Sequence, residues 1–224
     1  FRFNAWYGQA IDPAGLSACR ALKDGLRKIA RERIGKELKK MLSAPQPFIS
    51  LQAMAQTGVL NVILPEARPS DMLHNLHLNE ILTGQAPDPM RRLMALIAKT
   101  QQASEQTASA LRLSRAEEAR LSHWAKLDLL DMKQLSGRAL RVCLYRHGAK
   151  AVMDNALLSS TDARDIVAAC QSWHRPVFPV TGADLQSAGI APGPELGKTL
   201  ARLEEHWIAS DFRAEKRVLL DRLL

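Results

Sequence analysis

The most specific local pattern in the chain is the segment GIAPGPELG at residues 189–197. We expect one helix to end at its first glycine and another to begin at Gly193, with Gly197 in the first turn of the new helix. Free N–H groups at a helix start, among small residues, can bind a phosphate, and Lys198 and Arg202 extend the positive charge along that helix. The pattern also fits a tight helix–helix turn whose glycines only permit close packing.

Other residue types do not form a recognisable catalytic pattern. His74 and His77 lie three apart on an expected helix, but no third metal ligand has a suitable spacing. The carboxylates are scattered as helix caps and surface pairs, without a strand-borne acidic pair for Mg²⁺. No nucleophile elbow, triad or glycine-rich nucleotide loop occurs. We therefore expect no catalytic residue, metal site or cofactor site in this chain.

The net charge of +8 is concentrated near the start of the chain. Residues 1–44 hold ten Lys or Arg against four Asp or Glu. The candidate phosphate contacts in this segment are Arg20, Lys23, Arg27, Arg31 and Lys36. A polyanion such as RNA is a natural partner, because Lys and Arg neutralise backbone phosphates. The same charges also fit a solubilising surface.

Composition and hydrophobic spacing predict an all-α protein. Hydrophobic residues make up 46% of the chain, aromatic residues only 5%, and β-branched runs are short. Proline and glycine breaks divide the chain into many short helices. Two proline-rich breaks suggest a partial neck at residues 1–44, a helical body at 45–175 and a small helical tail at 176–224.

Several helix ends and faces follow from local patterns. Asp12 is expected to cap a helix with a buried face of Leu16, Cys19, Leu22, Leu26 and Ile29. The next helix, 32–42, is expected to expose Lys36, Lys39 and Lys40. Ser114 begins a further helix with a capping box. Ser210 and Asp211 are expected to cap a last helix that runs to the end of the chain.

The cysteines and the absence of long apolar runs suggest a cytoplasmic protein. Cys19, Cys143 and Cys170 are far apart and odd in number, which favours free thiols in a reducing compartment over a disulfide or a zinc site. No apolar stretch approaches the length of a membrane span, and no signal peptide is visible.

Several motifs together resemble the class II nucleotidyltransferases, which include CCA-adding enzymes and bacterial poly(A) polymerases. FRFNAWYG, IDPAGL and ARERIGKELKKML, at residues 1–42, resemble the neck of that family. VLNVILPE resembles the start of its body, LYRHGAKAVMDN its distal body, and FPVTGADLQSAGIAPGPELGKTLARLEEHWI its tail. These motifs follow the family's order over essentially the whole chain.

The resemblance implies an all-α neck, body and tail that hold RNA. Glu32, Arg33 and Glu37 match the neck motif, which in the family supports the nucleotide-reading helix. The resemblance also implies a separate catalytic head that binds Mg²⁺ and CTP or ATP, so this chain alone is expected to be inactive. The stretch MRRLMALIAK lacks the His-Asp pair of relatives with a phosphohydrolase domain.

The implied substrate is tRNA or another RNA 3′ end, and the glycine-rich tail favours CCA addition over poly(A) synthesis. Two other functions remain open. One is a stand-alone nucleic-acid-binding module in which GIAPGPELG acts like a helix-hairpin-helix. The other is a helical protein-interaction scaffold whose charge is incidental.

Overall fold

The computed structural model describes residues 1–8, 10–127, 135–159 and 162–223, and all its regular elements are helices. The all-α prediction is therefore confirmed. The first helices of the chain are α1 (Arg2–Tyr7), α2 (Pro13–Leu22), η1 (Lys23–Lys28) and α3 (Arg31–Leu42) in the neck, followed by α4 (Phe48–Gln56) and α5 (Val59–Ile63). Those of the middle of the chain are α6 (Asp71–Thr83), α7 (Pro89–Met94), α8 (Gln101–Leu111), α9 (Arg115–Lys126), α10 (Gly137–His147), α11 (Ala149–Ser159) and α12 (Arg164–Ser172). Those of the tail are α13 (Gly182–Ser187), α14 (Pro194–Ala209), α15 (Lys216–Leu220) and η3 (Asp221–Leu223).

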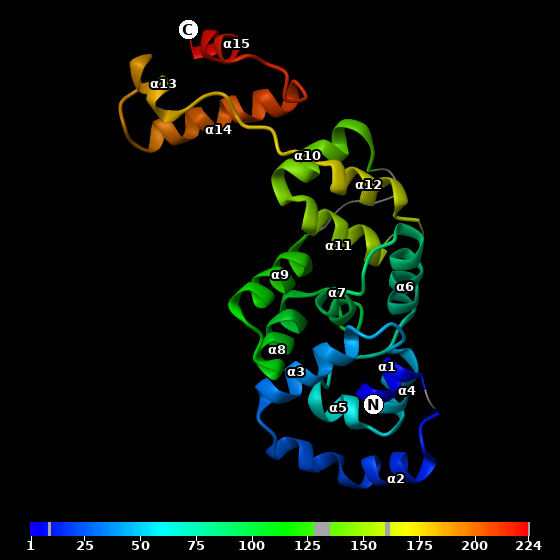
Figure 1. Ribbon diagram of the computed structural model, residues 1–224. Helices are drawn as coiled ribbons and strands as arrows, with labels where there is room; N and C mark the ends of the chain where they lie inside the picture. The colour runs from blue at the N-terminus through cyan, green and yellow to red at the C-terminus, as the bar shows by residue number, and fades with distance from the viewer. Residues whose placement is uncertain (9, 128–134, 160–161, 224) are drawn as a thin grey trace.

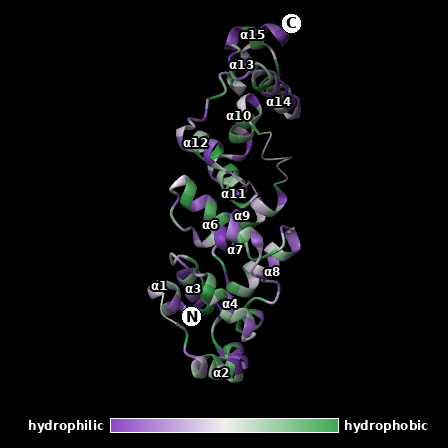
Figure 2. Cartoon of the chain, turned by 90° about the vertical axis from the view of Figure 1, so that its right-hand side faces the viewer, coloured by the Kyte–Doolittle hydropathy of each residue, from purple (hydrophilic) through white to green (hydrophobic). Residues whose placement is uncertain are grey.

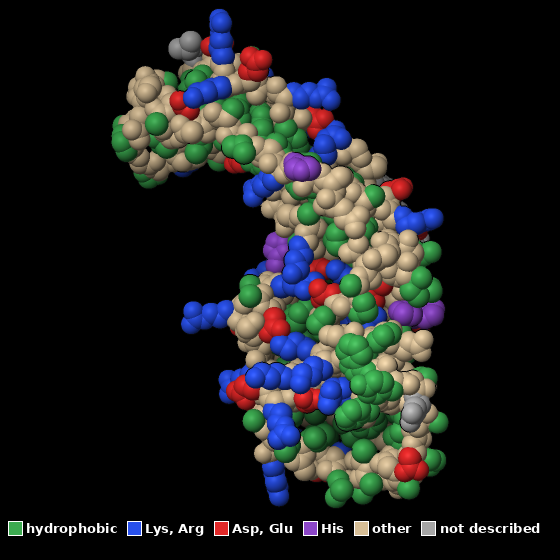
Figure 3. All heavy atoms as spheres, viewed as in Figure 1, with side chains coloured by type: hydrophobic (Ala, Val, Ile, Leu, Met, Phe, Trp, Pro, Cys, Tyr) green, Lys and Arg blue, Asp and Glu red, His purple; other side chains and the backbone are tan. Residues whose placement is uncertain are grey.

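The helices form an elongated, curved molecule rather than a sphere (Figure 1). α1 to α5 lie at one end, and α13 to α15 lie at the other. α14 extends over the concave side of the molecule, which α9, α10 and α11 border (Figure 1), and the surface beneath α14 is hollowed (Figure 3). The view from the side shows the same long outline (Figure 2). Such a shape presents a long surface for its size.

Two hydrophobic cores hold the chain together. The larger core runs from Ala5 to Cys170 and joins the neck helices to the body helices. The smaller core lies in the tail and includes Leu185, Leu203 and Trp207. Tyr145 of α10 also belongs to the tail core, so the tail packs directly on the body.

Two ion pairs reinforce the contact between tail and body. Arg141 donates to Asp211 at 2.6 and 2.9 Å, and Arg146 lies 2.6 Å from Glu205 of α14. The hydrogen bond from Arg141 holds the pKa of Asp211 below its usual range. Together with the shared core, these pairs set the position of α14 above the hollow.

A glycine in the neck allows α3 to approach α8 closely. A Cβ atom added to Gly35 would lie 2.4 Å from the carbonyl oxygen of Leu111. Any side chain there would push the two helices apart. Since Gly35 belongs to the segment that resembles the family neck, this motif has a packing role as well as a charged face.

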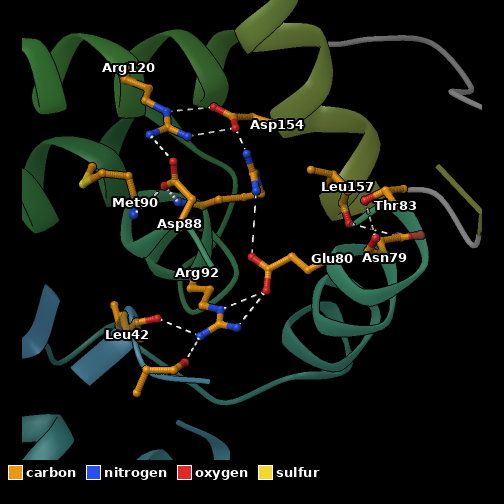
Figure 4. Close-up of polar contacts among 12 residues, drawn as sticks. Leu42, Asn79, Glu80, Thr83, Asp88, Met90, Arg92, Arg120, Asp154 and Leu157 are labelled. Atoms are coloured by element: carbon orange, nitrogen blue, oxygen red, sulfur yellow. Dashed lines mark hydrogen bonds and ion pairs between the residues drawn. The ribbon is translucent and has the colours of Figure 1, made fainter. Parts of the chain in front are cut away.

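The middle of the body contains a buried network of alternating charges (Figure 4). Its members come from α6, α7, α9, α11 and the residue before α7: Glu80, Asp88, Arg91, Arg92, Arg120 and Asp154. Three cations balance three anions, so the network as a whole carries no net charge. Balance of this kind is what allows charges to be buried at a tolerable desolvation cost.

Asp154 of α11 is the most heavily shared member of the network. Its carboxylate accepts hydrogen bonds from Arg91 at 3.0 Å and from Arg120 at 2.8 and 2.9 Å, and its side chain is only 2% exposed. Arg120 also lies 3.0 Å from Asp88, which caps α7 by accepting from Met90 N–H. One carboxylate therefore links α7, α9 and α11.

Arg92 extends the network toward the neck. It donates to Glu80 at 2.8 and 3.1 Å, to the Leu42 carbonyl at 2.8 Å and to the Ala44 carbonyl. These two carbonyls lie at the end of α3, where a helix leaves its last carbonyls without helical partners. Burial raises the pKa of Glu80, although Arg92 opposes that shift. The guanidinium of Arg92 thus connects the neck to α6 and α7.

Some sequence-based expectations about the first helices are wrong. Asp12 does cap α2, accepting from Gly15 N–H at 2.6 Å, but the α-helix ends at Leu22 and continues as the 3-10 helix η1. No residue of α2 is buried, and Leu22 and Ile29 are 74% and 39% exposed. The tighter winding of η1 changes the angular spacing of the apolar residues, so they no longer share one buried face.

Two further expectations need correction. Lys39 is half-buried rather than exposed, because it pairs with Glu117, the capping-box residue of α9. The last helix does not begin at Ser210, since Asp211 and Phe212 adopt left-handed backbone angles and α15 starts only at Lys216. The Ser210 hydroxyl accepts from Ala214 N–H at 2.9 Å, which closes a turn after α14.

Among the described residues, no helix is long and apolar enough to cross a membrane. The three cysteines are confirmed as free thiols. Burial raises the pKa of Cys170 to about 12, which keeps this thiol protonated and unreactive.

The charge network predicts the effect of removing its central carboxylate. Asp154→Ala should destabilise the chain by about 3–5 kcal/mol, because two buried guanidinium groups lose their main partner. The matched control is Asp162→Ala, which removes an exposed carboxylate paired with Arg164 and should change stability little. Urea unfolding of the three proteins measures the difference. Equal stability of Asp154→Ala and the wild type would contradict the structural role of the network.

Candidate nucleic-acid interface

The glycine-rich turn of the tail has the geometry of an open helix start. Gly193 precedes α14 with φ 151° and ψ −170°, a backbone conformation essentially limited to glycine, and no side chain caps the helix. A Cβ atom added at Gly193 or at Gly197 would have no described atom within 4 Å. Close packing against described residues therefore does not explain either glycine. The first turn of α14 instead stays open to an incoming group.

The basic residues of α14 lie on the exposed side of the same helix. Lys198 and Arg202 are both exposed, whereas Leu203 and Trp207 are buried in the tail core. Lys198 lies 3.8 Å from Glu195, but both side chains are 77% exposed, so water screens this pair strongly. Arg202 forms no ion pair with any residue of the described ranges. Both cations are available beside the open helix start.

The basic residues of α2 and η1 are partly engaged in the neck itself. Arg20 donates to the carbonyl of Gln56 at 3.3 Å, and Lys23 donates to the carbonyl of Arg20 at 3.3 Å. The stem of Lys23 also packs near Gly58. Arg27 lies 3.5 Å from Asp24 in an exposed pair. These contacts leave charge at the surface but fix the direction of two of the three side chains.

Arg31 and Lys36 lie on α3, where they make no hydrogen bond or ion pair with a described residue. Arg31 is half-buried and Lys36 is exposed. The turn between α8 and α9 adds Arg112 and Arg115, both exposed, to this region, and Arg112 lies 4.0 Å from Glu32. Sequence reasoning missed these two arginines, and the capping box that they flank was the only local signal. Lys and Arg side chains gather over this part of the molecule in Figure 3.

The neck-motif residues Arg33 and Glu37 line an apolar pocket. The pocket has a volume of about 390 Å³ and is formed mainly by aliphatic side chains of α3, η1, α4 and α5, together with Phe1. Glu37 lies 2.9 Å from Arg2 at its rim. Glu32 is exposed outside the pocket. Two of the three motif residues therefore line a cavity suited to an apolar segment rather than to a metal or a charged ligand.

The candidate phosphate contacts do not form a single cluster. The basic residues of α2, η1 and α3 lie at one end of the curved molecule, and the open start of α14 lies in the tail at the other end (Figure 1). A single small ligand cannot touch both regions, whereas a long polyanion can.

His77, one of the two histidines that could suggest a metal site, packs against another side chain of the body. His77 packs on the ring of Phe48, with 4.6 Å between the ring centres. Burial, Arg92 and His74 all lower the pKa of His77. The described residues contain no group of three or more His, Cys, Asp or Glu arranged to hold a metal ion.

Similarity in sequence and similarity in fold point to the same group of known proteins. Residues 8–70 match the sequence family described as "Probable RNA and SrmB- binding site of polymerase A". The chain is 28% identical over 236 residues to the mitochondrial CCA tRNA nucleotidyltransferase 1 of Mus musculus, and 28% identical over 237 residues to the CCA-adding enzyme of Levilactobacillus brevis. These alignments cover 98% of this chain but 53% and 57% of the two relatives.

The chain is similar to CCA-adding tRNA nucleotidyltransferases along nearly its whole length. It spans about half the length of the curated relatives that it matches. The fold agrees with that of the CCA-adding enzyme of Thermotoga maritima, solved in complex with tRNA, which matches 99% of this chain over 58% of its own length with a TM-score of 0.67. At 18% identity, that structure supports the shared fold alone. The family match at residues 8–70 covers the neck, where the net positive charge is concentrated.

The two glycines of the tail turn should respond differently to substitution. Gly193→Ala should destabilise the chain by about 1–3 kcal/mol, because alanine is strained at the φ and ψ of this position. Gly197→Ala should instead stabilise it by about 0.5–1 kcal/mol, since alanine is the better helix former and meets no neighbour. Chemical unfolding of both variants tests this. A destabilised Gly197→Ala would show that this glycine is needed for packing after all.

Proposed function

We propose that this chain is the RNA-holding region of a tRNA nucleotidyltransferase that adds CCA to tRNA 3′ ends. The observation that carries the proposal is the similarity to CCA-adding enzymes along 98% of the chain, together with the RNA-binding family match over the basic neck. The exposed cations at both ends of a long curved surface support the same function. CCA addition is favoured over poly(A) synthesis because the relatives named above are CCA-adding enzymes.

Recognition of tRNA by this surface would depend on shape and charge. The free cations and the open start of α14 suit backbone phosphates, which carry no base sequence. A folded RNA offers phosphates at fixed positions over a long distance, and a rigid curved protein can match such a pattern. Contacts near both ends of the chain would then distinguish a folded tRNA from a short RNA strand.

The nucleotide chemistry belongs, in this proposal, to a catalytic head of the same protein that binds Mg²⁺ and CTP or ATP. The apolar pocket lined by Arg33 and Glu37 supports a contact with that head, because its aliphatic walls need a nonpolar partner. Phe3, Trp6 and Tyr7 of α1 add exposed aromatic surface at the same end of the chain, at 66%, 45% and 71% exposure. The neck motif would act by positioning the head rather than by touching the reacting atoms. The free thiols suit a reducing compartment such as the cytoplasm.

The chain should bind tRNA with an affinity that depends steeply on salt. Between roughly 50 and 200 mM salt, the affinity should fall by at least about 100-fold, as expected when four or more phosphates are neutralised. Fluorescence anisotropy with labelled tRNA measures this dependence. No binding, or binding that salt does not weaken, would contradict an RNA-holding function and favour a protein scaffold. Equal affinity for tRNA and duplex DNA would favour the general nucleic-acid-binding module.

Substitutions should separate the two basic regions. The double variants Lys198→Gln/Arg202→Gln and Arg31→Gln/Lys36→Gln should each lower the slope of log affinity against log salt by about 2, because one phosphate contact contributes about 1. Arg164→Gln is the matched control, since this exposed arginine of α12 is already held by Asp162 at 2.5 Å and belongs to neither basic region. If a double variant has the same slope of log affinity against log salt as the control, the two substituted residues do not contact phosphate.

A further prediction concerns activity. The chain alone should incorporate no CMP or AMP into tRNA, because the part of the chain that the structure describes contains no group of three or more His, Cys, Asp or Glu arranged to hold a metal ion. The full-length protein should incorporate CMP and AMP into tRNA that lacks its 3′ end. Labelled CTP and ATP measure both reactions. Incorporation by the chain alone would refute the separation of RNA holding from chemistry.

A further inference from the structure

A small pocket lies on the inner side of the body, where α9 meets the junction of α10 and α11. Its volume is about 170 Å³, below the size of usual small-molecule sites but sufficient for a phosphate group. Arg120 and His123 line it from α9, His147 from α10, and Lys150 and Asp154 from α11. Histidine and basic side chains appear along the hollowed left side below the tail in Figure 3.

The floor of this pocket carries no free negative charge. Asp154 accepts from Arg120 at 2.8 and 2.9 Å and from Arg91 at 3.0 Å, and its side chain is 2% exposed. Arg120 is also paired with Asp88 at 3.0 Å. The buried network thus neutralises the carboxylate that would otherwise repel an anion.

The mouth of the pocket offers donors without partners. His123, His147 and Lys150 form no hydrogen bond or ion pair with any residue that the structure describes. The two imidazole rings lie 6.0 Å apart, close enough to contact one group together. The first turn of α11, an 11-residue helix, also lines the pocket through Ala151 and adds the partial positive charge of a helix start. These groups all favour an anion.

An ion pair connects the helix before the pocket to the tail helix α14. Arg146, the residue before His147, lies 2.6 Å from Glu205 of α14. Lys198 lies seven residues before Glu205 on that helix, a distance of about 10 Å along its axis. The open start of α14 and the pocket can therefore meet neighbouring parts of one strand that runs beneath the tail.

We infer that this pocket binds a backbone phosphate of the RNA, with His147 as a proton-dependent donor and with His123 and Lys150 as further donors beside it. The inference rests on the proposed RNA-holding function and adds a third contact between its two basic regions. Sequence reasoning did not find this site, because its residues come from three helices and form no motif.

Protonation of His147 should make the affinity for RNA depend on pH. Burial, His123 and Arg146 lower the pKa of His147, so this ring is mostly neutral in the free chain at neutral pH. The other charged groups around it are Arg120, Lys150 and Asp154 at the pocket, and Glu205 behind Arg146. A bound phosphate favours the charged ring and raises its pKa. Affinity for RNA should therefore increase as the pH falls from 8 toward 6, by up to about tenfold for each unit of pKa change.

The test measures binding of labelled tRNA by the full chain at fixed salt between pH 6 and 8. His123→Gln/His147→Gln should lose several-fold in affinity at pH 6 but little at pH 8, which flattens the pH dependence. Lys150→Gln should lose affinity at every pH, and Lys150→Arg should retain it. His74→Gln is the matched control, because that exposed histidine lies on α6, which contributes no residue to the pocket. Thermal unfolding checks that each variant is folded.

The outcomes distinguish this inference from the proposed function. If the wild type binds tRNA and the double histidine variant keeps its full pH dependence, the pocket does not bind phosphate and the inference is wrong. If the Lys150→Gln variant also binds like the wild type at every pH, the same conclusion follows independently of protonation. If the wild type does not bind tRNA at all, both the proposed function and the inference are wrong.

Discussion

The buried charge network around Asp154 is the interaction on which the rest of the structure depends. Because the helices are short, each offers little surface for packing against its neighbours. A further interaction must therefore fix the angles between the helices. Asp154 joins α7, α9 and α11, while Arg92 joins α7 to α6 and to the end of α3. Buried charges must meet their partners in one geometry, because an unpaired charge in the core is costly. The network therefore supports a defined curvature, and it also neutralises the floor of the inner pocket.

The curved scaffold is consistent with the proposed role in holding RNA. RNA backbones are recognised through charges at fixed distances, and a rigid body can hold such charges apart. The neck, the inner pocket and the start of α14 offer cations along the length of the molecule. Ion pairs of α10 with α14 and with Asp211 hold the tail in position above the hollow. The convex side is different, since α6 exposes Leu78, Ile81 and Leu82 there.

Local sequence patterns predicted the helices well, but they could not predict contacts between residues that lie far apart in the sequence. Asp12 and Gly193 act on their own helix ends, so their neighbours in sequence were sufficient to predict their roles. The face of α2 was predicted wrongly, because the chain winds as a 3-10 helix after Leu22, where η1 contacts α5. Arg91 and Asp154 are 63 residues apart, and no sequence pattern indicates their pairing. The pocket residues of α9 and α11 were missed for the same reason.

Hydrogen exchange of the chain, with and without bound tRNA, tests the central claim most directly. If the chain holds RNA along its curved inner side, tRNA should slow exchange at the start of α14, at the α10–α11 junction and along α3. Exchange at the exposed end of α6 should not change. Protection confined to α6, or no protection at the start of α14 and the α10–α11 junction, would contradict this account of the surface.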